Sequence, residues 1–459
     1  MTMHPDKMGH SGPASADSQF LAETAGKLLH RLFKQLKRPL ALRLWNGAVL
    51  QFGDAASAAP AAARRFVLVC HRPASISRMV LGRDPLRLAD AYFHGDVDVE
   101  GDFFAALALK DHLHQMHLAW RDRLPAALDT WRLLRTERVP GHHAGARSSV
   151  RRLQVQHHSR QENRQAIAFH YDVSNDFYAL WLDQGMVYSC AYFERPDQTL
   201  EAAQQAKLEH ICRKLLLKPG ERLLDIGCGW GALILHAAQH HGVHAHGITL
   251  SQNQLQLARQ RIASAGLQDR VTVELLDYRD LPATASYDKI SSVGMFEHIG
   301  LKNLPLYFQQ VHALLKPGGL FLNHGITHSE EGWEKTLSST FINRYVFPDG
   351  QLDTVSNITR RMELERFEIL DVESLRPHYA LTLRHWVQRL EQHHDAALRH
   401  VDEATWRVWR LYMAACALEF ESGDIGIYQI LAGKRGALPA GLPLTRRHLY
   451  TNADGHDPS

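Results

Sequence analysis

An acidic residue and three closely spaced glycines form the strongest chemical signal in this sequence. Asp225 lies near the end of an apolar run that starts at Leu223, and Gly227, Gly229 and Gly231 follow it. This pattern predicts a buried strand that turns sharply into a helix, because glycine adopts the positive φ of such a turn and leaves the backbone open to a ligand. The turn therefore forms a cradle of nucleotide size.

The spacing of the glycines distinguishes between kinds of nucleotide site. A dinucleotide fingerprint needs GxGxxG, and here the third glycine comes one residue early. A P-loop is excluded because no Gly-Lys-Ser/Thr follows. An acidic residue before GxGxG instead resembles motif I of the class I S-adenosylmethionine-dependent methyltransferases. In those enzymes the loop packs on the methionine part of the cofactor.

The next predicted strand, Val243–Ser251, differs at its end from the usual pattern of class I methyltransferases. Many class I methyltransferases end this strand in a carboxylate that binds the ribose, and here the corresponding place has none. The polar contacts to the cofactor must therefore come from four other residues: Thr249, Ser251, Gln252 and Gln254.

The third predicted strand, Val271–Tyr278, ends in two residues suited to adenine. Asp277 could accept a hydrogen bond from the adenine amino group, and Tyr278 could stack on the ring. A helix cap is the alternative role for Asp277, because aspartate is common at the first position of a helix.

A carboxylate and two imidazoles lie at the carboxyl ends of the fourth and fifth predicted strands. Glu297 and His298 come after the fourth strand, and His324 lies in the fifth. Converging beside a sulfonium, such groups could take or hold a proton. A structural hydrogen bond is the alternative, and these residues alone do not decide between the two.

These groups can meet only if the strands before them are neighbours in one sheet. Strands separated by single helices predict a doubly wound parallel sheet, whose ligands bind at the carboxyl ends of the strands. We expect an α/β fold of the class I methyltransferase kind, Rossmann-like and seven-stranded. Beyond the strands already named, the expected elements are helix Gln252–Ala265, strand Tyr287–Gly300 with its exit loop, helix Leu304–Leu315, turn Lys316–Gly319, strands Leu320–Ile326, Phe367–Leu375 and Ile427–Lys434, and a helical insertion over Thr382–Glu421.

The front of the chain predicts a smaller mixed α/β domain. A helix is expected over Leu21–Lys37, strands around Leu40–Phe52 and Arg64–Cys70, and a helical stretch over Ile76–Tyr92. The expected organisation is a disordered start at 1–19, a lipid-binding or dimerisation domain at 20–135, a basic linker at 136–162, the catalytic domain at 163–445 and a tail at 446–459.

Composition limits the classes of protein that this chain could be. No run of about 18 apolar residues occurs, so no membrane span is expected, and the first 19 residues lack a signal core, which favours a cytosolic location. The five cysteines include no CxxC pair, and adjacent histidines seldom converge on one ion, so no metal is expected.

The charge is distributed unevenly along the chain. Residues 1–165 contain 24 Lys and Arg against 15 Asp and Glu, a net charge of +9, and the remaining 28 against 34 give −6. A basic front third suits an anionic partner, which could be a membrane surface or a nucleic acid.

Ten motifs in a fixed order resemble the cyclopropane-fatty-acyl-phospholipid synthases and their mycolic-acid relatives. The likeness covers roughly residues 163–440, and the amino-terminal domain resembles the branch that acts on phospholipids. The motifs are HYDVSNDFY, YSCAYFE, TLEAAQQAK, LLDIGCGWG, GITLSQNQ, LLDYRDL, GMFEHIG, FLNHGI, FINRYVFPDG and LRPHYALTL.

The resemblance implies a mechanism and a set of residues. The double bond of an acyl chain attacks the methyl of S-adenosylmethionine, a bound bicarbonate removes a proton from the resulting carbocation, and the ring closes. Glu297, His324 and Tyr379 would hold the bicarbonate, with Cys190 and Ile326 around it. The implied cofactor contacts are Tyr188, Ser189, Leu224 with the glycine loop, Thr249 to Gln254, Asp277 and Tyr278.

Three features of this sequence leave the resemblance open in detail. Cys416 matches a cysteine of the family that could be a nucleophile, but the chemistry needs no thiol and a structural role is favoured. FLNHGI places Asn323 and Gly325 around His324, where relatives often have other residues. The aromatic segment His170–Glu194 could line a site for cations or form an ordinary core.

The resemblance also implies partners, and other functions remain to be weighed. We expect the inner face of an anionic phospholipid membrane, peripheral attachment to it and a homodimer, with no nucleic acid. Alternatives are a lipid methyltransferase with a branched or methylene product, an RNA methyltransferase, and an inactive lipid-binding scaffold. The RNA alternative predicts NPPY or Pro-Cys after the fourth strand, where this sequence has FEHI.

Overall fold

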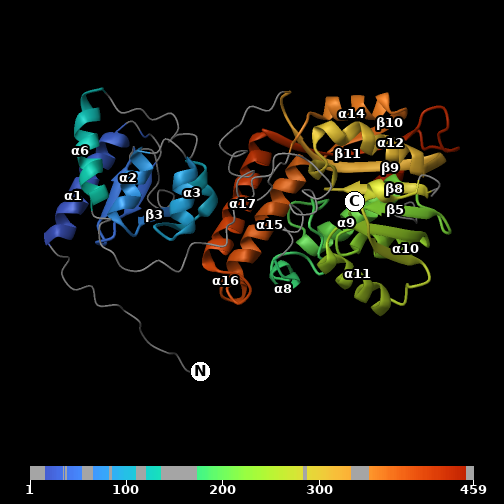
Figure 1. Ribbon diagram of the computed structural model, residues 1–459, viewed down its shortest axis with the longest axis horizontal. Coiled ribbons are helices and arrows are strands. Elements are labelled where there is room, and N and C mark those ends of the chain that lie inside the picture. Colours follow the sequence, from blue (N-terminus) through green and yellow to red (C-terminus); the bar gives the residue numbers. More distant parts are fainter. Residues whose placement is uncertain are drawn as a thin grey trace. The chain divides into compact units, whose positions relative to one another are not determined.

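Two sheets organise the chain, one in each of two units (Figure 1). The computed structural model describes residues 16–34, 36, 39–53, 66–81, 85–109, 120–135, 173–282, 287–331 and 351–450. The units are Met1–Ser149 with Glu403–Val408, and Val150–Asp402 with Trp409–Ser459. The basic linker expected at 136–162 lies outside the described residues.

The first unit holds a four-stranded sheet in the order β2-β1-β3-β4. β1 pairs in parallel with β3, and the other two pairings are antiparallel. Helices pack on this sheet around an apolar core. The elements are α1 (Ala16–Leu32), β1 (Leu40–Arg43), β2 (Val49–Phe52), β3 (Phe66–Cys70), α2 (Pro73–Leu81), α3 (Pro85–Phe93), β4 (Val97–Gly101), α4 (Phe103–Leu107), the 3₁₀ turn η2 (Trp120–Asp122) and α6 (Arg123–Leu134).

The mixed α/β character of this unit is confirmed, and one boundary was wrong. The expected disordered start at 1–19 overlaps α1, which already begins at Ala16. Ala22, Ala25, Leu28 and Leu29 form the buried side of this helix, so the core that they share with the sheet explains why helix continues toward the amino terminus. Residues 1–15 lie outside the described part of the chain.

The second unit holds a seven-stranded sheet in the order β10-β11-β9-β8-β5-β6-β7. The five strands from β9 to β7 are parallel, and β11 runs antiparallel to both of its neighbours. The strands are β5 (Arg222–Ile226), β6 (His244–Thr249), β7 (Val271–Leu275), β8 (Tyr287–Val293), β9 (Leu315–His328), β10 (Phe367–Ser374) and β11 (Ile425–Lys434).

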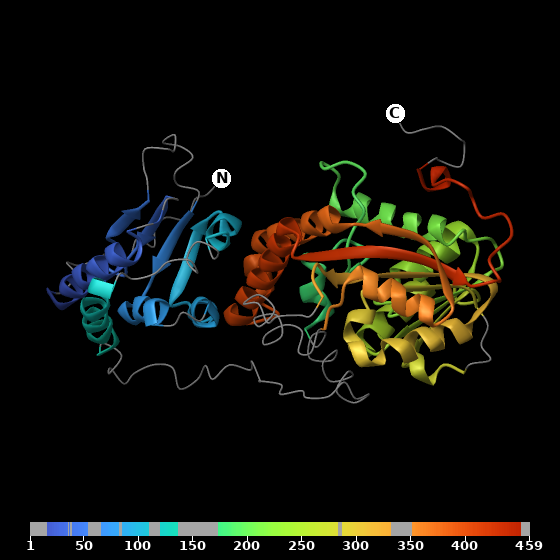
Figure 2. The ribbon, with the colours of Figure 1, turned by 90° about the horizontal axis from the view of Figure 1, so that it is seen from above.

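Helices cover both faces of this sheet (Figures 1 and 2). One apolar core joins the sheet to α9, α10 and α11, and another joins it to α12 and α14. The helices of the unit are α8 (Asn175–Ala179), α9 (Leu200–Lys214), α10 (Ala232–His241), α11 (Gln252–Ser264), α12 (Leu304–Leu314), α14 (Val355–Leu364), α15 (Arg376–Gln392), α16 (His394–Ala397), the part of α17 (Glu403–Ser422) that follows Val408, and α18 (Arg447–Tyr450). Short 3₁₀ turns are η4 (Tyr278–Asp280), η5 (Phe296–His298) and η6 (Leu301–Asn303).

The doubly wound seven-stranded sheet is therefore confirmed, with two local differences. The expected turn at Lys316–Gly319 is part of β9, because a register shift against β8 accommodates these residues within the pairing. The expected tail at 446–459 contains α18, which packs on α9 through the buried Leu449. Residues 451–459 lie outside the described residues.

Candidate active site

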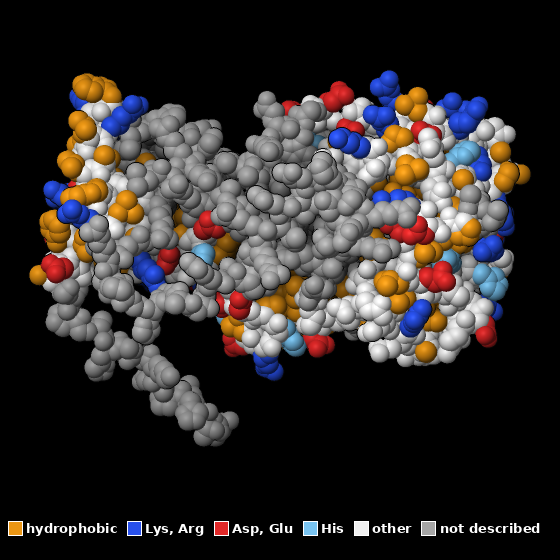
Figure 3. All heavy atoms as spheres, viewed as in Figure 1, with side chains coloured by type: hydrophobic (Ala, Val, Ile, Leu, Met, Phe, Trp, Pro, Cys, Tyr) orange, Lys and Arg blue, Asp and Glu red, His pale blue; other side chains and the backbone are white. Residues whose placement is uncertain are grey.

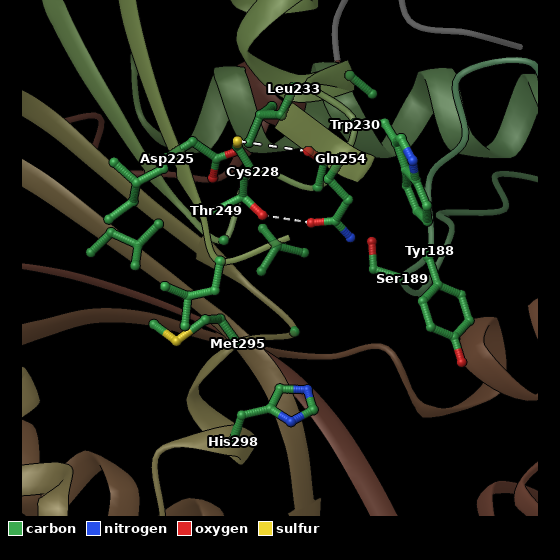
Figure 4. A pocket seen from close by; sticks show the side chains of 18 of the residues that line it. Tyr188, Ser189, Asp225, Cys228, Trp230, Leu233, Thr249, Gln254, Met295 and His298 are labelled. Carbon is green, nitrogen blue, oxygen red and sulfur yellow. Dashed lines mark hydrogen bonds between the residues drawn. The ribbon is translucent and has the colours of Figure 1, made fainter. Parts of the chain in front are cut away.

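The glycine-rich loop forms the predicted turn between β5 and α10. Gly227, Gly229 and Gly231 have φ of +82°, +55° and +86°, which L-residues with side chains adopt at a cost. The backbone N–H groups of Gly227 and Cys228 both donate to the carbonyl of Ile248, at 3.0 Å, which ties the loop to β6. The glycines leave their backbone open toward the cavity, and the side chains of Cys228 and Trp230 between them also line it (Figure 4).

A cavity lies over the carboxyl ends of β5, β6 and β8 (Figure 4). Its wall includes most of the residues expected to contact the cofactor, and it also includes Met295 and His298 below them in Figure 4. The expected residues in the wall are Tyr188, Ser189, Asp225, Gly227, Gly229, Thr249, Gln254, Asp277 and Tyr278.

Four expected cofactor residues lie outside this wall. Leu224 is fully buried in β5, and Gly231 begins α10 and faces Ala258. The hydroxyl of Ser251 accepts from the backbone of Gln254 as the cap of α11, and Gln252 is exposed. In the stretch from Thr249 to Gln254, the residues that line the cavity are therefore Thr249, Leu250 and Gln254.

Hydrogen bonds within the wall fix its polar side chains. The Thr249 hydroxyl donates to Oε1 of Gln254 at 2.7 Å, as Figure 4 shows. The Ser291 hydroxyl donates to Oδ1 of Asp225 at 2.7 Å. Burial raises the pKa of Asp225 to about 6, while Ser291 and nearby Lys207 oppose this shift. The site is therefore arranged before a ligand enters it.

Asp277 is held by its near neighbour Arg279. The Arg279 guanidinium donates to both carboxylate oxygens of Asp277, at 2.8 and 2.6 Å. Asp277 also caps the 3₁₀ turn η4, so the alternative role as a cap is present in the structure. The carboxylate still lines the cavity. Because each of its oxygens can accept more than one hydrogen bond, a ligand could donate to the lone pairs that Arg279 does not use.

Lys207 on α9 is a wall residue that sequence reasoning missed. Its side chain is 2% exposed, and its ammonium donates to the hydroxyl of Ser189 at 3.1 Å. Burial lowers the pKa of Lys207 to about 8, against the attraction of Asp183 and other acidic groups. Gln204, one turn earlier, donates to the carbonyls of Val187 and Ser189. The motif TLEAAQQAK contains this lysine, but the sequence alone indicates no partner for it.

Glu297 is buried at the end of β8 with one oxygen unpaired. Its Oε1 accepts the backbone N–H of Ile326 at 2.7 Å, whereas Oε2 has no hydrogen-bond partner among the described residues. Burial raises the pKa of Glu297 to about 7. A proton on this carboxyl is therefore easily gained or lost near neutral pH.

His324 is buried on β9, two residues before Ile326, and also has an unpaired atom. Its Nδ1 lies 3.2 Å from Nε2 of Gln429, which as placed donates to it and leaves the proton on Nε2. Nε2 finds no partner in the described structure. Burial lowers the pKa of His324 well below 6.5, so the ring is neutral.

Contacts link the other expected catalytic residues to this region. Cys190 is fully buried. Its thiol donates to the carbonyl oxygen of Ala191 at 3.2 Å and lies 3.8 Å from the carbonyl oxygen of Leu375. The backbone N–H of Leu375 donates to the carbonyl of Ile427 on β11. Ile427 is in turn paired with Ile326 on β9. Tyr379 follows on α15, one turn after Leu375.

Cys416 lies on α17, one turn before Phe420. The ring centroid of Phe420 lies 4.7 Å from the ring centroid of Tyr379. Cys416 is buried and is not among the residues that line the cavity, and its structural role stays a prediction. The structure also explains Gly325: a Cβ there would lie 1.8 Å from Cε1 of Phe296, the residue before Glu297.

The aromatic segment forms mostly core. Phe177, Tyr178 and Trp181 are fully buried and pack on one another with ring centroids 5.3 to 6.3 Å apart. Among the described aromatic residues of this segment, Tyr188 alone lines the cavity. Its ring packs 5.2 Å from Trp386 on α15, so the helical insertion supports this side of the site.

Comparisons with known proteins agree with this geometry. Residues 158–430 match the family described as mycolic acid cyclopropane synthetase. A probable fatty acid methyltransferase of Pseudomonas putida is 41% identical over 420 residues, which cover 91% of this chain and 98% of that protein. The cyclopropane-fatty-acyl-phospholipid synthase of Escherichia coli (strain K12) is 42% identical over 264 residues, 57% of this chain and 66% of that one.

A solved structure is similar in the same region. The mycolic acid cyclopropane synthase CmaA1, complexed with SAH and CTAB, has a TM-score of 0.56 and 34% identity, and the match covers 59% of this chain and 98% of that one. The sheet, the glycine loop and the cavity define a class I S-adenosylmethionine-dependent methyltransferase. Within that class, the chain belongs to the mycolic acid cyclopropane synthetase family.

Proposed function

We propose that this enzyme adds the methyl carbon of S-adenosylmethionine across the cis double bond of a phospholipid acyl chain and closes a cyclopropane ring. The observation that carries the proposal is that Glu297, just after β8, and His324, on the neighbouring strand β9, each keep a buried atom without a partner in the described structure, Oε2 and Nε2. Met295 and His298, on either side of Glu297 in the chain, line the cavity. The relatives named as fatty acid methyltransferase and cyclopropane-fatty-acyl-phospholipid synthase support a lipid acceptor.

The cavity wall fits S-adenosylmethionine, which supplies an electrophilic methyl carbon when bound. The glycine loop offers backbone close to the ligand, and Ser189, Thr249 and Gln254 offer polar atoms. Asp225 and Asp277 offer carboxylate oxygens for hydroxyl and amino groups. Tyr188 adds an aromatic face, which favours a neighbouring cation by about 0.5 to 2 kcal/mol.

Bicarbonate belongs to the same proposal, because the unpaired atoms suit an oxyanion. Neutral His324 has an Nε2–H to donate to one oxygen. Glu297, with a pKa of about 7, is protonated in part at neutral pH and can donate from Oε2 to another. A base held at these two atoms would take the proton that ring closure releases. Tyr379, Cys190 and Ile326 surround the region in this proposal.

A membrane surface is the proposed source of the substrate, and α6 of the first unit supports it. Four large apolar side chains recur on the outside of η2 and α6 with exposed fractions of 50 to 79%: Trp120, Leu124, Leu128 and Trp131. Arg121, Arg123, Arg132 and Arg135 are exposed beside them. Orange and blue side chains mark this edge in Figure 3. Tryptophan and arginine together suit an anionic lipid interface.

Mass spectrometry of acyl chains tests the reaction. The full-length protein is incubated with S-adenosylmethionine and vesicles of cis-monounsaturated phospholipid, and the acyl chains are then hydrogenated. We expect a gain of one CH₂ that takes up no hydrogen, which identifies a ring. A gain that takes up hydrogen would replace this proposal with a methylene product, and a saturated branched chain would replace it with methyl transfer and reduction. No gain would contradict a phospholipid acceptor.

Vesicle sedimentation tests the membrane surface. Leu124→Glu with Leu128→Glu should release the protein from anionic vesicles, whereas Leu306→Glu, at an exposed leucine of the other unit, should not. Equal binding by all three proteins would contradict this surface. In the described part of the chain no helix is long and apolar enough to cross a bilayer. The homodimer rests on family resemblance alone, and sedimentation equilibrium of the full-length protein tests it.

A further inference from the structure

The facing sides of α9 and α10 bring together four potential metal ligands away from the cofactor cavity. Cys212 and Glu209 lie on α9, and His236 and His241 lie on α10. The ligand atoms of Cys212, His236 and His241 all lie within 4.8 Å of one another. The cluster was not expected from the sequence, because its members come from two helices and only one of them belongs to a histidine doublet.

Glu209 joins the cluster from the solvent side. Its Oε2 lies 3.1 Å from Nε2 of His236 and 3.0 Å from Nε2 of His241. Two ligand atoms of a tetrahedral zinc ion lie about 3.3 Å apart, given bonds of about 2.0 to 2.1 Å. The carboxylate oxygen therefore already lies at close to the required spacing from each imidazole nitrogen, and the two imidazole nitrogens and the thiol lie within 4.8 Å of one another.

The cluster also has the surroundings of a metal site. Arg213 donates to the other oxygen of Glu209 at 2.8 Å, which orients the carboxylate as outer partners of metal ligands do. Cys212 is fully buried, and the two histidines are mostly buried with side-chain exposures of 11% and 18%. The thiol thus forms the floor, and the carboxylate closes the cluster toward solvent.

We propose that Cys212, His236 and His241 bind one Zn²⁺, with Glu209 as the fourth ligand. A set of one sulfur, two imidazoles and one carboxylate suits zinc, which accepts all three donor types in tetrahedral geometry. On binding, the thiol releases its proton to solvent and the thiolate bonds to the metal. Each imidazole loses the Nε2 proton that it donates to Glu209 and takes one up from solvent on Nδ1, so that it stays neutral and binds the metal through the Nε2 lone pair.

The ion would act as a structural clamp. α9 carries Gln204 and Lys207, whose side chains hold the backbone and hydroxyl of the Tyr188–Ser189 wall, and α10 begins at the glycine loop. Joining the two helices from behind would hold both sides of the cofactor cavity. The site has no substrate of its own in this proposal, and its existence does not depend on which acceptor the enzyme methylates.

Metal binding to the full-length protein tests the proposal. The purified protein is stripped with chelator and titrated with Zn²⁺ alone, and in parallel with Co²⁺, whose bond to a thiolate gives a charge-transfer absorption band. We expect one bound ion per chain, a Co²⁺ thiolate band and a rise in melting temperature with Zn²⁺. The band should be absent in Cys212→Ala.

Histidine variants separate ligands from bystanders. His236→Gln and His241→Gln should each weaken Zn²⁺ binding at least about 100-fold, since each removes a direct ligand. The matched control His244→Gln, at an exposed histidine just after α10, should bind as the wild type does. Because both histidines lie at the partly exposed side, these variants should fold even if Cys212→Ala does not.

Three results would overturn the zinc site: no stoichiometric metal in the wild type, a Co²⁺ complex without a thiolate band, or unchanged affinity in the two histidine variants. The cluster would then be a hydrogen-bond network in which Glu209 accepts from two imidazoles. Acyl-chain methylation by the same preparations is scored separately, so failure of the metal site and failure of the proposed reaction give different patterns.

Discussion

The two sides of the active site differ in how their buried polar groups are satisfied. On the cofactor side, the carboxylates of Asp225 and Asp277 and the hydroxyl of Thr249 all have protein partners. Beyond β8, Glu297 and His324 each keep an atom without a partner in the described structure. An unpaired buried polar atom costs about 1 to 3 kcal/mol. The first side is thus organised to position a ligand, and the second is organised around a group still to be bound.

Among the substitutions that test this difference between the two sides, replacement of Glu297 should have the largest effect on activity. Glu297→Gln keeps the size of the side chain but replaces the carboxyl that holds the base in our proposal with an amide, so we expect kcat to fall about 100-fold to 10,000-fold. S-adenosylmethionine affinity, measured by calorimetry without lipid, should change little because Glu297 does not line the cavity. A variant with full activity would show that Glu297 does not hold the base, and a parallel loss of affinity would show that the two sides are not separate.

Gly325 should be nearly as sensitive, although it contributes no side chain. Gly325→Ala places a Cβ 1.8 Å from a ring carbon of Phe296, so the ring must move and Glu297 beside it must move as well. Overpacking of this kind costs about 1 to 3 kcal/mol of stability, and we expect a loss of activity of about 10-fold to 100-fold. Calorimetric unfolding and acyl-chain analysis measure the two effects.

A second substitution tests the cause. In the double variant Gly325→Ala, Phe296→Leu, the smaller side chain frees the space, and part of the activity should return. If the double variant is no more active than Gly325→Ala, the ring of Phe296 is not what constrains this position.

On the cofactor side, a substitution should change binding and leave chemistry intact. Thr249→Val removes the hydroxyl that donates to Gln254. The hydroxyl also accepts the backbone N–H of Ser251 at 3.1 Å. The loss of two hydrogen bonds, each worth about 1 kcal/mol, should weaken S-adenosylmethionine binding about 10-fold to 30-fold with kcat nearly unchanged. Thr272→Val, at an exposed threonine on β7, is the matched control. A fall in kcat at saturating cofactor would contradict the division between the two sides.

Local patterns predicted the sheet and the loop because each depends on neighbouring residues. The run from Leu223 to Gly231 contains both the strand and the glycines of its turn, and the structure has both there. Long-range packing could not be read in this way. Lys207 meets Ser189, and Cys212 meets His236 and His241, only because α9 packs beside them.

Competition between two partners for one side chain was equally hard to predict. Asp277 was weighed as an adenine contact or a cap, and Arg279 two residues later occupies both of its oxygens. Phe177, Tyr178 and Trp181 had the composition of a cation site and form core, because burial of their large apolar area dominates over any contact with a ligand. One packing partner that all three rings share, Trp409, lies more than two hundred residues later in the chain.

The dependence of stability on pH offers the smallest and most specific effect. Burial raises the pKa of Glu297 from 4.5 to about 7. Between these values the folded protein keeps a proton that the unfolded chain releases, so the free energy of unfolding of the wild type falls as pH rises through this window. Glu297→Gln lacks this contribution. The variant should therefore gain stability relative to the wild type from pH 5 to pH 7.5, by up to about 3 kcal/mol.

Denaturant unfolding of both proteins at several pH values measures this difference, and Asp225, which burial also affects, contributes equally to both. A difference that stays constant with pH would show that Glu297 is ionised in the folded protein throughout. Its Oε2 would then need a positively charged or donating partner, and Glu297 could not donate to a bound oxyanion. The same measurement therefore decides whether the unpaired oxygen is a donor or an acceptor when the enzyme works.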